Sequence, residues 1–237
     1  ESAGLTRSAT PKRIALLVSR GSEDWWQLAH AADPLLAEQG YHYRQAIEDV
    51  LLSRGYPYDR LYLDRSDHLE KMKDYGVLIV PFPYSVSDRA AAALERCAAA
   101  GAGIVLFSQT GPVDEFGDRR EKPALADLVA AGRANVVFDK TDVLLVGYQP
   151  AFLNRFLGTV DRLLGKNKDW HFAKSDRDDV YFTFNRLGEK TFALVVNYEE
   201  HPVTVELGFD LADGAYDVTA WTEGKGWRTR LADEDSP

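Results

Sequence analysis

Residues 75–81, Tyr-Gly-Val-Leu-Ile-Val-Pro, decide the fold. Their continuous apolar run is typical of a strand buried on both faces, as the strands of parallel sheets are. Two runs of the same kind lie at Arg13 to Ser19 and at Gly103 to Ser108. We therefore expect a parallel sheet with these three segments at its centre.

Helical patterns separate these runs. Residues 43–54 carry one apolar stripe and end at Gly55, and an alanine-rich helix extends from Ser87 to Gly101. A short helix is expected at Ala124 to Ala131. Weaker strand signals complete the pattern, at Tyr58–Leu63, Asn135–Phe138 and Val143–Val146. This alternation predicts an α/β fold with a doubly wound, mostly parallel sheet.

The pattern changes after an amphipathic helix that opens at Pro150 and closes at Gly165. Short β-branched and aromatic segments then alternate with turns, which predicts a small antiparallel β-sandwich. Its expected strands are Val180–Asn185, Thr191–Asn197, Val203–Leu207, Tyr216–Trp221 and Trp227–Leu231. We place a linker or tail at 1–11, the α/β domain at 12–166 and a C-terminal β domain at 167–237.

Charge and composition exclude several classes of protein. The 237 residues hold 28 basic and 37 acidic side chains, a formal charge of −9. That balance argues against nucleic acid and against an anionic membrane surface as partners. Cys97 is the only cysteine and the five histidines are scattered, so no disulfide, metal site or cofactor is expected.

The first residue is Glu1 and no signal-peptide pattern follows it. We expect a processed chain or a piece of a longer one. The compartment stays open between cytoplasmic and secreted.

Three loops follow the carboxyl ends of the central strands, where open α/β sheets bind ligands. They are Ser19–Gln27, Pro81–Ser87 and Ser108–Arg120. In the first loop, Trp25 and Trp26 could stack on a sugar ring or pack at a domain contact, and the two interpretations weigh equally. The third loop offers further contact candidates, namely Gln109, Asp114, Glu115, Arg119 and Arg120.

Catalytic roles for these side chains are disfavoured. Asp114 and Glu115 could form the carboxylate pair of a glycosidase, but an ion-pair cluster with the neighbouring arginines is the favoured interpretation. Ser108 stands where a nucleophile would, yet a nucleophile elbow wants glycines where Leu106 and Thr110 stand.

Two further groups complete the search for catalytic residues. His42 is the one base we would name for a nucleophilic Ser108. Cys97 is interpreted as a small helix-packing residue. Glycine-rich phosphate loops are absent from the sequence.

Several segments, in this order, resemble the trimerisation domain of bacterial family-42 β-galactosidases. They are Ile14 to Trp26 (Ile-Ala-Leu-Leu-Val-Ser-Arg-Gly-Ser-Glu-Asp-Trp-Trp), Asp74 to Pro81, Ala102 to Phe107, and Thr110 to Glu115. The resemblance implies a fold like that of class I glutamine amidotransferases without their catalytic residues. Residues 178–231 are similar to the small C-terminal β domain of such glycosidases, chiefly through Leu194-Val195-Val196-Asn197.

This resemblance implies a non-catalytic accessory and oligomerisation region of a glycoside hydrolase acting on a β-glycoside. Its partners would be carbohydrate, further copies of the chain, and a catalytic (β/α)₈ barrel on the same precursor or on another chain. A barrel needs about 200 residues, and the two expected domains leave too few residues in this sequence for one. Two alternatives remain: a hydrolase that uses Ser108, and a carbohydrate-binding protein with an aromatic row at Tyr181, Tyr216 and Trp221.

Overall fold

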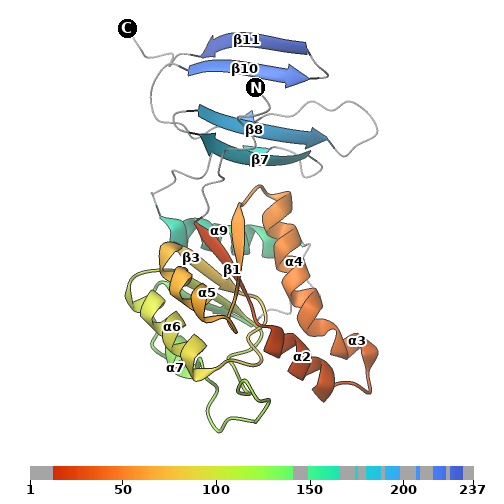
Figure 1. Cartoon of the computed structure of the whole chain (residues 1–237), viewed down its shortest axis with the longest axis vertical. Helices are drawn as coiled ribbons and strands as arrows, with labels where there is room; N and C mark the ends of the chain where they lie inside the picture. Colours follow the sequence, from red (N-terminus) through yellow and green to blue (C-terminus); the bar gives the residue numbers. More distant parts are fainter. Residues whose placement is uncertain are drawn as a thin grey trace.

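A five-stranded parallel sheet forms the centre of the computed structural model (Figure 1). The structure describes residues 13–140 and 149–165, together with the backbone of six strands between residues 174 and 231. The sheet order is β2 (Tyr58–Tyr62), β1 (Ile14–Val18), β3 (Val77–Val80), β4 (Gly103–Phe107), β5 (Val136–Asp139). Every neighbouring pair is parallel, which confirms the predicted α/β sheet. The predicted strand Val143–Val146 lies outside the described residues.

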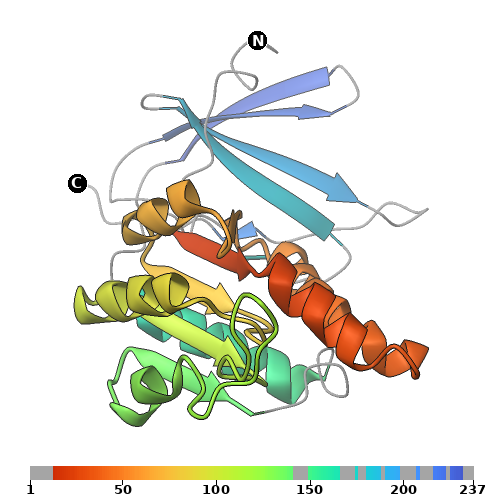
Figure 2. The same ribbon diagram turned by 60° about the horizontal axis from the view of Figure 1, so that its bottom comes forward.

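Helices cover both faces of this sheet (Figure 2). On one face lie α4 (Gln39–Ser53) and α9 (Pro150–Leu164), and on the other lie α5 (Ser66–Lys71), α6 (Asp88–Ala99) and α7 (Ala126–Ala130). Two short helices and a 3₁₀ turn complete the domain: α2 (Arg20–Ala29), α3 (Pro34–Ala37) and η1 (Met72–Asp74). The sheet is therefore doubly wound.

Alternation along the strands supplies both cores. Ile14 and Leu16 of β1 face α4 and α9, whereas Ala15 and Leu17 face α6, and all four are at most 1% exposed. A strand buried on both faces has no polar side, which explains the continuous apolar runs. On the α9 side, Phe107 packs against the stacked rings of two phenylalanines, Phe152 and Phe156.

The structure corrects the first of the three predicted loops. Ser19 to Gln27 is not a loop, because helix α2 begins directly after β1. The Ser19 side chain caps it by accepting a hydrogen bond from the Ser22 N–H at 3.0 Å. Both tryptophans therefore lie on a helix. Helix α4 also begins earlier than predicted, at Gln39.

The described strands beyond residue 173 pair in antiparallel fashion. They form β7 (Val180–Leu187) with β8 (Lys190–Asn197), β10 (Tyr216–Thr222) with β11 (Lys225–Leu231), and β6 (Lys174–Ser175) with β9 (Leu207–Gly208). Of the predicted strand Val203–Leu207, only Leu207 lies within the described residues. A single sandwich and the domain boundaries stay predictions.

Candidate functional site

The sheet order places its switch point between β1 and β3. In doubly wound sheets of this order, ligands bind at the carboxyl ends of those two strands. Here the crevice holds three serine side chains of the chain itself, Ser19, Ser22 and Ser85, each at most 5% exposed. The hydroxyls of Ser19 and Ser22 donate to the Ser85 carbonyl at 3.0 and 2.9 Å, and the Ser85 N–H donates to Ser22 Oγ at 2.8 Å. The customary ligand position is therefore filled from within.

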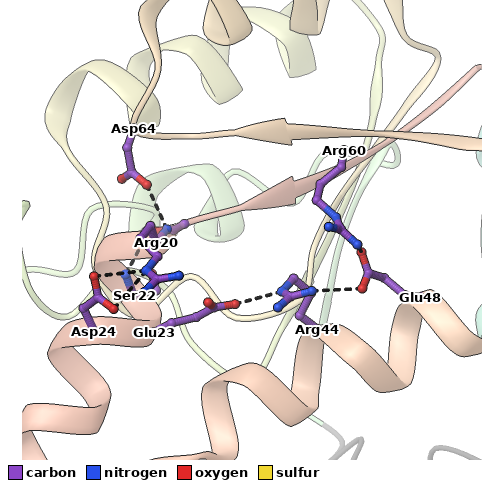
Figure 3. Close-up of polar contacts among 9 residues, drawn as sticks. Arg20, Ser22, Glu23, Asp24, Arg44, Glu48, Arg60 and Asp64 are labelled. Carbon is purple, nitrogen blue, oxygen red and sulfur yellow. Dashed lines mark hydrogen bonds and ion pairs between the residues drawn. The ribbon is translucent and has the colours of Figure 1, made fainter.

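Helix α2, which carries Ser22 and is capped by Ser19, is fixed at its start (Figure 3). The backbone N–H of Arg20 donates to Asp64 Oδ2 at 2.8 Å, just beyond the end of β2. The Arg20 guanidinium pairs with Asp24 one turn on, at 3.1 Å. The first turn of α2 is thus tied to the neighbouring strand and to itself.

A four-membered charge network holds the same helix from the other side (Figure 3). Arg44 of α4 bonds Glu23 of α2 at 2.8 Å and Glu48 at 3.0 Å, and Glu48 also binds Arg60 of β2. Burial alone would lower the pKa of Arg44, but its bond to Glu23 and the two carboxylate charges raise it. Three elements, α2, α4 and β2, are therefore joined by these ion pairs.

Trp25 joins helix α2 to the third predicted loop. Its indole N–H donates to the Glu115 carbonyl at 3.2 Å. A Cβ on Gly117 would lie 2.6 Å from the Trp25 ring, and Gly117 has φ +87°. Only glycine fits against this ring in that conformation. The structure thus brings together two of the loops that the sequence singled out.

Trp26 packs within the domain. Its indole N–H donates to the Leu36 carbonyl at 2.7 Å, and its ring stacks on His30 with centroids 4.0 Å apart. Phe82 and Tyr84 form T-shaped contacts with the same ring. Both tryptophans are partly buried, and sugar stacking by either stays a prediction.

Asp114 orders the third loop through backbone groups. Its Oδ1 accepts the N–H groups of Phe116 and Asp118, both at 2.9 Å, and its own carbonyl accepts the Ser85 hydroxyl at 2.7 Å. This carboxylate is committed to the turn. Glu115 remains exposed at the tip.

The two arginines of this loop differ. Arg120 binds Asp88 at 2.8 Å and the Val86 carbonyl at 3.1 Å, and its nearest approach to Glu115 is 3.9 Å. Arg119 is exposed, and its backbone forms an isolated bridge with Val113. Arg120 therefore anchors the loop to the start of α6 more than it neutralises the loop's own carboxylates.

Ser108 has an unusual backbone. Its φ is +61°, and the N–H of Gln109 donates to the Phe107 carbonyl at 2.6 Å, which closes a three-residue turn at the end of β4. The missing glycines suggested that no elbow forms here, yet the backbone adopts the left-handed region. The turn also consumes the Gln109 N–H, which would otherwise be free to stabilise an oxyanion.

The proposed base lies among other partners. His42 approaches Glu38 at 3.4 Å and contacts the Tyr41 ring. Within the described part of the chain, no interaction joins His42 to Ser108. Cys97 lies in the core between the sheet and α6, where burial raises the pKa of its thiol.

Exposed apolar side chains occur on α2, on α3 and in the third loop, and the sequence analysis did not single them out. Phe116 is 72% exposed beside Gly117, and Leu28 of α2, three residues after Trp25, is 65% exposed. Leu35 at the start of α3 is 87% exposed. Periodicity alone could not find them, because exposure depends on how α2, α3 and the loop are arranged.

Within the described ranges, no three His, Cys, Asp or Glu side chains gather closely enough to hold a metal ion. No described helix has the length and apolar character needed to cross a membrane. The side chains of Tyr181, Tyr216 and Trp221 lie outside the described part.

Comparison with known proteins gave matches among solved structures alone; no protein-family model and no curated protein matches. Gan42B, a GH42 β-galactosidase from G. stearothermophilus, superposes with a TM-score of 0.57 at 14% identity, over 94% of this chain and 39% of that one. The GH42 exo-carrageenase of Bacteroides ovatus gives 0.52 at 9% identity, over 93% and 28%. Alpha-L-fucosidase isoenzyme 2 of Paenibacillus thiaminolyticus gives 0.55 at 12% identity, over 98% and 48%.

These likenesses show a shared fold. The chain spans less than half the length of each of these three proteins. Its fold is thus a GH42-like fold found as one part of longer glycoside hydrolase chains.

Proposed function

We propose that this chain is a non-catalytic accessory and oligomerisation region of a glycoside hydrolase that acts on a β-glycoside. It would dock against a catalytic barrel, on the same precursor or on another chain, and support the wall of its carbohydrate pocket. The likeness to parts of two GH42 enzymes and a fucosidase supports the glycosidase context.

The filled crevice carries the non-catalytic part of the proposal. A ligand at the switch point would have to displace three buried hydroxyls, of which two bond the Ser85 backbone and the third bonds the Asp114 carbonyl. Leaving a buried N–H or C=O unpaired costs about 1–3 kcal/mol, so such a ligand is disfavoured.

Two exposed apolar side chains support docking through the edge of the sheet where the strands end. Phe116 and Leu28 are exposed beside Trp25, and the Asp114 turn together with the Arg120 anchor fixes the loop tip. An interface gains from a pre-ordered apolar contact, because little entropy is lost on binding. We therefore assign Phe116 and Leu28 as contact residues for a second copy of the chain, and Trp25 as the residue that holds the loop in position.

Sedimentation velocity of the full chain tests the oligomerisation proposal. We expect concentration-dependent self-association that Phe116→Asp and Leu28→Asp each weaken, because a buried charge in an apolar contact is costly. Leu52→Asp, at an exposed position of α4 away from the loop, is the matched control. A chain that stays monomeric, or variants that associate as the parent does, would contradict this role.

Hydrolysis of p-nitrophenyl β-galactoside tests the non-catalytic proposal. We expect no turnover above background from the chain alone. Turnover that persists through repeated purification would refute it.

A second candidate, a hydrolase that uses Ser108, is favoured by its left-handed backbone. Strained conformations of this kind cluster at active sites. It ranks second because the Gln109 N–H is already donated within the turn. If a fluorophosphonate labels the chain and Ser108→Ala abolishes that labelling, the hydrolase becomes the favoured function.

A further inference from the structure

An open hollow of about 310 Å³ lies at the opposite edge of the sheet from the serine-filled crevice. It opens where β1, β3 and β4 begin, between the carboxyl-terminal ends of α6 and α9. In Figure 1 this is the edge that faces β7 and β8. Its volume falls at the lower end of the range typical of small-molecule sites.

Small residues create the hollow. Its wall contains Gly76 and the segment Ala100-Gly101-Ala102 after α6. Gly101 has φ +97°, and a Cβ there would meet nothing within 4 Å. At Gly103 the absent side chain lets Leu163 of α9 approach closely, because a Cβ would lie 2.7 Å from that leucine. The helix is thus drawn against β4, while space remains beside Gly101.

The lining combines two cations with an apolar wall. Arg13 and Lys73 line the hollow, and among the described residues neither side chain has an ion pair or hydrogen bond. Leu163, Leu164 and the buried Cys97 supply the apolar part. The Arg13 and Lys73 side chains are both exposed.

The remaining polar wall is already engaged. The Tyr75 hydroxyl donates to the Asp59 carboxylate of β2 at 2.7 Å. That carboxylate therefore has a partner within the domain. Burial raises the pKa of the Cys97 thiol, so the apolar wall is neutral near pH 7.

We propose that this hollow binds a small organic carboxylate with a short apolar body. The carboxylate would bridge Arg13 and Lys73, since a guanidinium fork and an ammonium both match it, and the body would lie against Leu163 and Leu164. This site is independent of the accessory role, which concerns the other edge of the sheet.

Titration of the full ¹⁵N-labelled chain with octanoate tests the proposal. We expect saturable shifts, complete by roughly 10 mM, at the amides of Gly76, Gly101 and Ala102. Octanamide, which has the same apolar body without the charge, is the matched ligand control.

Variants identify the cations. Arg13→Gln with Lys73→Gln should weaken octanoate binding about tenfold. Lys71→Gln, an exposed lysine two residues away, should leave it unchanged. The proposal is overturned if no shifts occur up to that concentration, if octanamide binds equally well, or if the shifts centre on the Ser22 edge.

Discussion

Replacement of Ser22 by alanine should destabilise the domain far more than the loss of one hydroxyl on a helix would suggest. Ser22 is fully buried, and its hydroxyl both donates to the Ser85 carbonyl and accepts from the Ser85 N–H. The Ser85 carbonyl keeps its bond from the Ser19 hydroxyl, but the Ser85 N–H would lose the one partner it has among the described residues.

An orphaned buried N–H costs about 1–3 kcal/mol, and the second lost hydrogen bond adds about 0.5–1.5 kcal/mol. We expect a loss of roughly 2–4 kcal/mol in the free energy of unfolding. For a chain of this size that corresponds to a fall in Tm of roughly 4–16 °C. Helix propensity offsets little of this, because alanine exceeds serine by only about half a kcal/mol.

Urea unfolding followed by far-ultraviolet circular dichroism measures this loss. Ser66→Ala, at an exposed position that begins α5, is the control and should fall within about 0.5 kcal/mol of the parent. A Ser22→Ala variant as stable as that control would refute the reasoning. It would mean that water already reaches the crevice and can replace the hydroxyl.

Three further outcomes are expected. Glu48→Ala should lower the free energy of unfolding by about 2–4 kcal/mol. The loss is smaller than for a fully buried pair because Arg60 is 44% exposed. In the same urea assay, Glu95→Ala at an exposed position should be neutral. Gly117→Ala should lower the free energy of unfolding by about 1–3 kcal/mol, because Gly117 has φ +87° and a Cβ there would strike the Trp25 ring. It should also speed proteolysis between residues 112 and 120, and cleavage at the parental rate would contradict this. Burial, helped by Asp161, raises the pKa of Tyr56 above its usual 10.0, so stability is complete below pH 10 and declines as pH rises above it. Above pH 10, the urea midpoint of Tyr56→Phe should fall less steeply with pH than that of the parent. An unchanged slope would contradict the role given to Tyr56.

The sheet could be predicted because its strands are buried on both faces. The runs at Ile14–Val18 and Gly103–Phe107 carry that signal without help from the rest of the chain. Helix α9 was predicted from Pro150 to Leu164 because its periodicity, opening proline and closing Gly165 all agree.

Helix α2 was missed because Trp25 and Trp26 are adjacent, and a helix sends adjacent side chains to different faces. One ring holds the third loop and the other enters an aromatic cluster. An adjacent pair with separate tasks leaves no periodic signal. The Ser19 cap was the available clue.

The contacts that define the site could not be predicted from spacing. Trp25 and Glu115 lie 90 residues apart, and Ser22 and Ser85 lie 63 apart. The network of Glu23, Arg44 and Glu48 joins residues whose charges look like ordinary solvated faces in the sequence. Only the order of the strands brings them together.

The turn at Ser108 has a consequence for protein engineering. A non-glycine residue at φ +61° costs about 1–2 kcal/mol, so Ser108→Gly is a substitution that should add stability. The same turn already presents a hydroxyl at the end of β4, as hydrolases of layered α/β architecture do. A designer seeking a new esterase would keep this backbone path, free the Gln109 N–H and add a base within hydrogen-bond reach. In this scaffold those changes would concern only a few side chains around the end of β4.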